Sequence, residues 1–184
     1  MDSPRTLPKQ AAGVLTATEC AVLGLLTKGE RSGYDLAKKA EQSVGYVWAP
    51  ARSQIYAVLP RLVRAGLARS RKVPQAARPD KVVYRITRKG RDALRVWLEE
   101  SEDSEATFLL RVFFGDQMSR EALVGLIERR RARARATLAE FKEIGRSGPD
   151  YYPSLTLRWG LAHHRALIRW ADEMLRELER GGGV

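Results

Sequence analysis

The sequence predicts a mainly α-helical fold in two parts, and three observations support this. Apolar residues recur at the three- and four-residue spacing of amphipathic helices through most of the chain. Period-two alternation, which is typical of strands, is confined to residues 67–87. The formal net charge of +11 is carried by residues 1–98, which hold 19 basic and 7 acidic side chains. The first part is therefore expected to meet a polyanionic partner.

Three helices are expected before residue 67. The first follows a capping residue, Thr16 or Thr18, with Glu19 behind it. Pro50 stands at the start of the third helix, where its missing N–H costs nothing, and Gly66 takes the position just after its end. The predicted ranges are about 16–28, 32–44 and 51–65. Residues 1–14 carry two prolines and little periodicity, so a flexible arm is expected there.

A β-hairpin and a fourth helix follow. Residues 67–73 and 81–87 have the pattern of strands, and the prolines between them belong in an exposed basic loop. The next helix is expected over about 88–100. Three helices, a hairpin and a further helix in this order predict a winged helix-turn-helix domain over residues 15–100.

The C-terminal part is predicted to be a helical dimerisation domain over residues 105–180. An acidic stretch precedes it. Its first helix, residues 108–114, is too apolar to face water on any side, so we expect it to be buried. Ser119 can cap a long helix that runs to about Ile144. A last helix is expected over about 154–180.

The last helix carries two adjacent apolar stripes, which need two partners. One partner can be the long helix of the same chain, and the other is most simply a second copy of the protein. The stripe assigned to the contact between copies is Leu157, Leu161, His164, Ile168, Leu175 and Leu178, with Ala171 between them. The neighbouring stripe is Gly160, His163, Leu167, Trp170 and Met174. A homodimer held by C-terminal helices is therefore predicted.

Several classes of protein are disfavoured by what the sequence lacks. A lone Cys20 cannot form an intrachain disulfide, fits a reducing compartment and is expected to be a small buried hydrophobe. Common catalytic signatures are absent, so we expect no enzyme, no catalytic residue, no metal and no cofactor. No stretch approaches the roughly 18 apolar residues of a membrane span, and no secretory leader is seen. A cytoplasmic protein that does not bind membranes is expected.

The third helix carries the side chains expected to contact DNA. Arg52 and Gln54 are the candidates for reading bases, because Arg pairs bidentately with guanine and Gln with adenine. The candidates for phosphate contacts are Ser53, Tyr56 and Arg61. Arg78 and Lys81 of the hairpin are expected near the minor groove or the backbone. The alternative interpretation is an ordinary solvated helix face.

Short segments in a fixed order mark residues 15–98. They are Leu15-Thr16-Ala17-Thr18-Glu19, Leu23-Gly24-Leu25-Leu26, Ser32-Gly33-Tyr34-Asp35-Leu36, Trp48, Ser53-Gln54-Ile55-Tyr56, Leu59, Arg61-Leu62, Ala65-Gly66-Leu67, Val83-Tyr84-Arg85-Ile86-Thr87 and Lys89-Gly90. In joint order and spacing they resemble the winged-helix domain of the PadR family of bacterial transcriptional regulators. The chain from Phe108 through Trp170 is similar to the longer C-terminal helical region that a subgroup of the family shares with virulence-gene activators.

The resemblance implies a homodimer that binds an inverted-repeat operator in double-stranded DNA. Such regulators usually repress a neighbouring gene and are often released by a small molecule. Ser32 and Tyr34 join the expected DNA contacts. Many relatives carry His where Ser32 stands, so a phosphate contact by this side chain would survive, whereas a charge-dependent contact would not.

A planar, aromatic effector is expected in the C-terminal part. Its predicted site comprises Phe108, Phe113, Trp159, His163 and Trp170, for which hydrophobic core is the alternative. His163 and His164 point about 100° apart on a helix, so core or interface positions are expected for them rather than a metal site. The basic run 129–135 is either a solvated face or a further DNA contact.

Three functions remain open on the sequence. The first, which we favour, is an operator-specific repressor that responds to a ligand. The second is a winged-helix protein of architectural type that binds nucleic acid without sequence choice. The third is an interaction module whose basic face docks an acidic protein.

Overall fold

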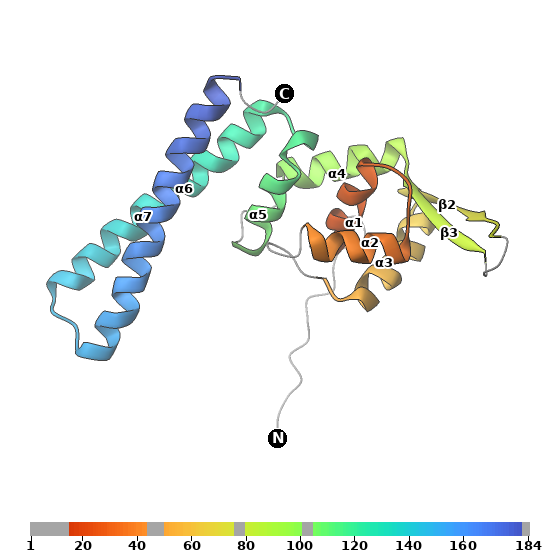
Figure 1. The fold of residues 1–184 in the computed structure, drawn as a ribbon. Helices are drawn as coiled ribbons and strands as arrows, with labels where there is room; N and C mark the ends of the chain where they lie inside the picture. The colour runs from red at the N-terminus through yellow and green to blue at the C-terminus, as the bar shows by residue number, and fades with distance from the viewer. Residues whose placement is uncertain (1–14, 44–49, 76–79, 101–104, 182–184) are drawn as a thin grey trace. The chain divides into compact units, whose positions relative to one another are not determined.

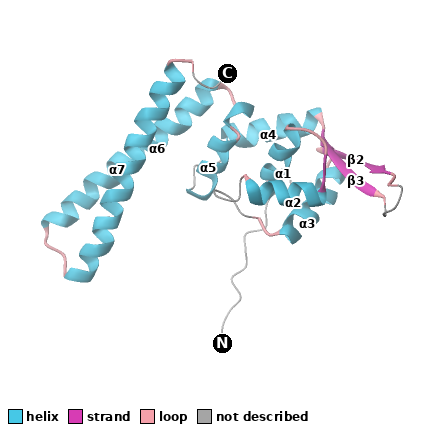
Figure 2. Cartoon of the chain, viewed as in Figure 1, coloured by secondary structure: helices cyan, strands magenta, loops and turns pink. Residues whose placement is uncertain are grey.

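The computed structural model describes residues 15–43, 50–75, 80–100 and 105–181. These residues are mainly helical with one small sheet, as Figure 2 shows, which confirms the predicted fold class. The chain divides into two compact units, residues 1–117 and residues 118–184. Within the described ranges, no helix combines the length and the apolar character needed to cross a membrane.

The first unit is the predicted winged helix-turn-helix, extended by one helix. Its described elements are α1 (Ala17–Thr27), β1 (Arg31–Ser32), α2 (Gly33–Gln42), α3 (Arg52–Arg64), β2 (Ala68–Val73), β3 (Lys81–Ile86), α4 (Arg88–Glu100), α5 (Glu105–Phe113) and the 3-10 helix η2 (Gly115–Gln117). The strands lie in the order β1-β3-β2, and both pairs are antiparallel. The β2–β3 hairpin forms the wing, which extends beyond the helices in Figure 1.

The sequence did not predict β1. This strand consists of Arg31 and Ser32 alone, whose partners on β3 are Tyr84 and Val83. A two-residue strand is too short to show alternation along the sequence, so only its pairing with β3 reveals it.

Caps define the helix ends in this unit. The Thr16 hydroxyl accepts a hydrogen bond from the Glu19 N–H at 3.2 Å, and the Glu19 carboxylate accepts one from the Thr16 N–H at 2.9 Å. Gly66 follows α3 with φ of +71°, and the N–H groups of Gly66 and Leu67 donate to carbonyls in the last turn of the helix. Pro50 lies before the N-cap residue of α3 rather than within its first turn.

The core of the first unit is built on α1. Every residue of the apolar run 20–26 is buried, and α1 contacts α2, α3 and α4. Burial raises the pKa of the Cys20 thiol, so this side chain packs as an inert hydrophobe, as predicted. The buried leucines and isoleucine that the neighbouring helices contribute are Leu36, Ile55, Leu59, Leu62, Leu94 and Leu98.

α5 belongs to the first unit, which differs from the predicted domain boundary near residue 105. Phe108 is buried, and the Phe114 ring lies so close to Gly24 of α1 that a Cβ on this glycine would be 2.5 Å from it. α5 thus contributes to the same core as α1. The expectation that no side of this helix faces water is wrong, since Leu109 and Phe113 are each 44% exposed.

The second unit is a helical hairpin of α6 (Arg120–Arg146) and α7 (Tyr151–Glu179), drawn at the left of Figure 1. The Ser119 hydroxyl caps α6 as predicted and accepts from the Ala122 N–H at 3.2 Å. α7 begins three residues earlier than expected, because Pro153 is tolerated in the first turn of a helix. Gly160 permits close helix packing, since a Cβ there would be 2.4 Å from the Phe141 ring of α6.

The α7 stripe assigned to a contact between copies packs largely within the chain. Ala171 is fully buried and Leu175 is 7% exposed, and both form a cluster with Ile127 of α6, against which Leu178 packs. His164 lies edge-on to an aromatic ring of α6, with 5.5 Å between centroids. The remaining members of the stripe, Leu157, Leu161 and Ile168, are half-buried. Within the chain, α6 therefore covers Ala171, Leu175 and Leu178, because periodicity reveals an apolar face but not which partner covers it. The contact between copies stays a prediction.

Candidate nucleic-acid interface

α3 presents one apolar and one polar face. Its buried residues are Ile55, Val58, Leu59 and Leu62. The exposed residues of its first turns are Arg52, Ser53, Gln54 and Tyr56. In a helix-turn-helix, this part of the recognition helix meets base edges. The structure confirms that these side chains are exposed to solvent, as predicted.

Arg52 is paired with Glu41 at the end of α2. Its Nε and Nη2 donate to the two carboxylate oxygens at 2.6 and 2.9 Å. These hydrogen bonds raise the pKa of Arg52 and lower the pKa of Glu41. The outer edge of the guanidinium, formed by Nη1 and the second Nη2 hydrogen, makes no hydrogen bond within the described residues.

Sequence reasoning missed Glu41. Eleven positions separate it from Arg52, and the two residues lie on different helices. No periodic or local pattern connects them, so only the packing of α2 against α3 reveals the pair.

Two other predicted contacts also have intramolecular partners. The Gln54 Oε1 accepts a hydrogen bond from the Ala51 N–H at 3.1 Å, which closes the first turn of α3. The Arg61 Nη2 lies 3.4 Å from a carboxylate oxygen of Glu19, with about half of the Arg61 side chain exposed. Both side chains are therefore positioned at the surface by the protein itself.

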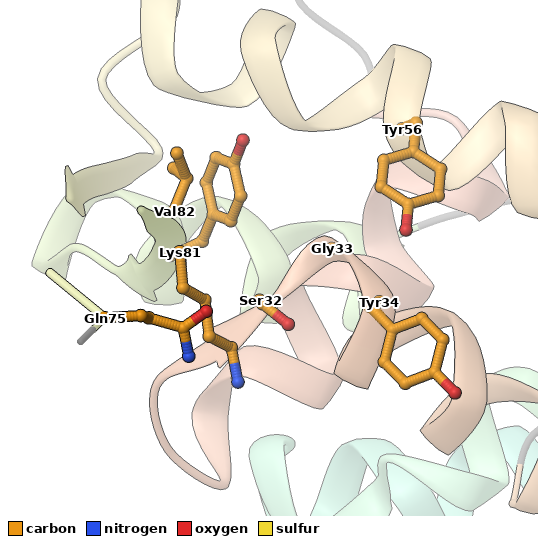
Figure 3. A pocket seen from close by; sticks show the side chains of 8 residues that line it. Ser32, Gly33, Tyr34, Tyr56, Gln75, Lys81 and Val82 are labelled. Carbon is orange, nitrogen blue, oxygen red and sulfur yellow. The ribbon is translucent and has the colours of Figure 1, made fainter. Parts of the chain in front are cut away.

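A hollow of about 410 Å³ lies between α2, α3 and the wing (Figure 3). Its lining consists of Ser32, Gly33, Tyr34, Tyr56, Gln75, Lys81, Val82 and Tyr84. It adjoins the N-terminus of α2, where backbone N–H groups and the helix dipole favour an anion. Tyr34 is 60% exposed beside it. A Cβ on Gly33 would be 2.6 Å from the Tyr56 ring, so the glycine lets this ring lie close to the N-terminus of α2.

The role of Ser32 differs from the prediction. The side chain is buried, and its hydroxyl donates to the Asp35 carboxylate at 2.8 Å and accepts from the Asp35 N–H at 3.2 Å. These bonds cap α2 and engage the hydroxyl both as donor and as acceptor, so the predicted phosphate contact is corrected to a capping role. The Ser-x-x-Asp spacing is the sequence signal that could have identified this cap.

Lys81 is held over the same cap. Its Nζ lies 2.8 Å from the Asp35 carboxylate, and hydrogen bonds from Lys81 and then Ser32 hold the pKa of Asp35 below its ordinary value. The ammonium group therefore remains at the edge of the hollow. Arg78, the other predicted wing contact, lies outside the described residues.

The predicted effector residues have different environments. Phe108 is core of the first unit, whereas the half-exposed Phe113 lies edge-on to Phe114. In the second unit, Trp159 is 71% exposed and stacks on His163, with 5.2 Å between centroids and 11° between planes. The half-buried Trp170 packs against the cluster around Ala171 and Leu175. The core alternative is therefore correct for Phe108.

A charged hollow lies between α6 and α7. Its lining consists of Arg120, Val124, Glu128, Arg131, Asp172, Leu175, Arg176 and Glu179, which include none of the predicted effector residues. Arg131 and Arg135 both pair with Asp172, at 2.8 and 3.4 Å, so this part of the basic run joins the two helices.

In the part of the chain that the structure describes, no group of three or more His, Cys, Asp or Glu could hold a metal ion.

Two family models match the chain, one in each part. The Transcriptional regulator PadR-like family matches residues 22–96, and the Virulence activator alpha C-term model matches residues 106–179. Residues 22–96 thus form a PadR-like domain, and residues 106–179 form a Virulence activator alpha C-term domain. The relatives of the chain are regulators rather than enzymes.

Two curated relatives span nearly the same length. The Negative transcriptional regulator PadR of Bacillus subtilis is 27% identical over 175 residues, which cover 87% of this chain and 96% of the relative. A probable transcriptional regulator of Mycobacterium tuberculosis is 27% identical over 181 residues, covering 86% and 96%. Among solved structures, B. subtilis PadR in complex with operator DNA has a TM-score of 0.45 at 27% identity and covers 89% of this chain and 99% of that chain. The same protein in complex with p-coumaric acid has a TM-score of 0.39 at 26% identity and covers 89% and 99%.

Proposed function

We propose that this PadR-like regulator is a repressor that binds an inverted-repeat operator as a homodimer. The observation that carries the proposal is the exposed start of α3, with Arg52 and Gln54 beside the tyrosine- and lysine-lined hollow. Candidates for base contacts and for phosphate contacts therefore lie on one surface of the first unit, which carries the excess of basic residues. The operator contact is also supported by the relative that was crystallised with operator DNA.

The hollow between α2, α3 and the wing is proposed to hold a backbone phosphate. The hydroxyl groups of Tyr34 and Tyr56 supply neutral donors, and Lys81 supplies a positive charge. None of these groups distinguishes one base from another, so their role is to position α3 on the duplex.

The proposed base contact is made by the outer edge of Arg52. Arg offers five N–H donors, of which Glu41 takes two on one side. The outer Nη1 and Nη2 donors have the fork geometry that matches O6 and N7 of guanine. Glu41 would thereby orient the guanidinium while it contacts the base.

Replacing Arg52 and Glu41 tests this arrangement. Arg52→Ala is expected to reduce the preference for guanine at one operator position by about 1–3 kcal/mol. Glu41→Ala is expected to strengthen binding to scrambled DNA, because a negative charge near the backbone is removed, and to weaken the same guanine preference. Competition binding with operators substituted one base at a time measures both effects. In the Arg52→Ala background, Glu41→Ala should no longer alter base preference; an unchanged effect there would contradict the proposed contact.

The function itself is tested by binding to the DNA upstream of the protein's own gene and to a scrambled duplex, over a range of salt concentrations. A preference of about a thousandfold or more for the upstream DNA supports an operator-specific regulator. Equal, salt-dependent binding to both duplexes favours the architectural alternative. Absence of binding to either duplex favours a protein-interaction module.

An exposed aromatic stripe on α7 is the proposed contact between two copies. Tyr152 is 78% exposed, Leu155 42% and Trp159 71%, and the small exposed residues Ala162 and Ala166 continue their three- and four-residue spacing. Tyr and Trp are enriched at the centres of protein interfaces. A two-fold axis would place this stripe of one copy against the same stripe of the other.

Replacing Tyr152 and Trp159 together by Asp is expected to convert the dimer to monomers while the helix content stays unchanged. Each charge would have to be buried against an apolar partner surface. Analytical ultracentrifugation and circular dichroism measure the two quantities. Lys142→Asp, an exposed change on α6, is the control and should leave the dimer intact. A dimer that survives the double replacement would exclude this stripe as the interface.

The aromatic effector stays a proposal, now restricted to Trp159 and His163. Their stacked rings lie at the proposed contact between copies, so a small aromatic acid would stack on Trp159 between the two copies rather than on an open surface. Quenching of tryptophan fluorescence by p-coumaric acid, lost in Trp159→Leu and accompanied by weaker operator binding, would support it. Quenching without any change in operator affinity would not.

A further inference from the structure

Four arginines line a second hollow in the first unit, at the base of the wing. The hollow measures about 480 Å³, and its lining consists of Arg69, Arg85, Ile86, Thr87, Arg88 and Arg91. Neighbouring residues of a strand point to opposite faces of a sheet, so Arg85 points away from the face that carries Tyr84. The arginine hollow is therefore distinct from the one between α2, α3 and the wing, which Tyr84 lines.

Within the described residues, the four arginines of this hollow have no acidic partner of their own. None of the four guanidinium groups forms a hydrogen bond or ion pair within the described residues, and no acidic side chain lines the hollow. Glu30 feels the charge of Arg85, but its pKa is lowered first by the hydrogen bond from Arg71. That carboxylate is already bound by Arg71 at 2.6 Å.

Two of the charges are placed against each other. Arg69 on β2 is the direct cross-strand partner of Arg85 on β3. Side chains in such a pair share one face of the sheet at short range, and like charges there destabilise the hairpin.

The other two charges oppose a helix dipole. Arg88 and Arg91 lie in the first turn of α4, which contains no acidic residue. The N-terminus of a helix carries a partial positive charge, so cations there are unfavourable and anions are favourable. Two independent features thus place repelling charges around the same hollow, and a bound polyanion would relieve both.

We propose that the arginine hollow binds closely spaced phosphate groups, as found in a linear polyphosphate, a nucleotide polyphosphate or the backbone of duplex DNA beyond the half-site. Guanidinium groups bind phosphate oxygens through paired, charge-assisted hydrogen bonds. The partial positive charge at the N-terminus of α4, whose Gly90 N–H is capped by the Thr87 hydroxyl at 3.0 Å, adds to the attraction for an anion. The assignment does not depend on operator recognition by α3.

Isothermal titration calorimetry of the full chain with inorganic tripolyphosphate tests the site. One strong site per chain is expected, and the double variant Arg88→Gln, Arg91→Gln should weaken it by about tenfold or more. The same variant should raise the melting temperature, because it removes charges that oppose the helix dipole. Lys38→Gln, Lys39→Gln is the matched control, since it removes two exposed positive charges from α2 in the same unit.

Two duplexes distinguish the sources of phosphate. One ends at the limits of the operator footprint, and the other is extended by about one helical turn on each side. If the ligand is flanking DNA, the arginine variant loses affinity for the long duplex only. If the ligand is a free polyphosphate, the arginine variant and the wild type have equal affinities for each duplex. Tripolyphosphate then also binds to the wild-type protein in its complex with the operator.

The proposal is overturned if tripolyphosphate binding weakens equally in the arginine and lysine variants, because attraction would then reflect net charge alone. Failure of operator recognition gives a different result. In that case the wild type would not distinguish operator from scrambled DNA, while its tripolyphosphate site would remain intact.

Discussion

Arg111→Met is expected to lower the free energy of unfolding by about 3–5 kcal/mol. Arg111 is 1% exposed, and its Nε donates to the Leu98 carbonyl at 2.7 Å while its Nη2 donates to the Glu99 carbonyl at 3.2 Å. These carbonyls belong to the last turn of α4, where no further N–H of the helix can reach them. Methionine keeps much of the apolar stem but supplies no donor, so buried carbonyls lose their partners.

Urea denaturation followed by circular dichroism measures this loss. Arg95→Met is the control, because Arg95 is exposed and only 3.5 Å from Asp92 in a surface pair. Its effect should stay within about 0.5 kcal/mol. Similar midpoints for the two variants would mean that Arg111 does not join α5 to the end of α4.

Gly90→Ala is expected to cost about 3 kcal/mol or more. A Cβ at this position of α4 would be 2.1 Å from the Leu67 carbonyl oxygen and 2.9 Å from a side-chain carbon of Ile86. The Leu67 carbonyl is itself fixed by hydrogen bonds from the backbone and hydroxyl of Thr87, at 3.0 and 3.1 Å. The backbone would have to move, since no flexible side chain can yield.

Gly125→Ala provides the contrast for this substitution. Gly125 lies inside α6, and the nearest atom to an added Cβ is the flexible end of Arg129, at 3.1 Å. Alanine is a better helix former than glycine, so this variant should be more stable than the wild type by about 0.5–1 kcal/mol. A loss of stability from both substitutions would indicate a general intolerance of alanine rather than the close approach at Gly90.

The sequence alone predicted features that depend on neighbouring residues. Helix periodicity, the Thr16 cap, the glycine after α3 and the alternating strands of the wing all have local causes. These signals were sufficient for the winged helix-turn-helix, the long C-terminal helices and the polar face of α3. The exposure of Arg52, Ser53, Gln54 and Tyr56 followed from the same periodicity.

Only the tertiary structure decided which partner each face and side chain meets. It joined α5 to the first unit, engaged Ser32 in a cap, paired Arg52 with Glu41 and covered Leu175 with α6. Most of these contacts connect residues far apart in the chain, and periodicity specifies the direction of a side chain but not its partner. The arginine hollow likewise exists only because β2, β3 and α4 meet at the base of the wing.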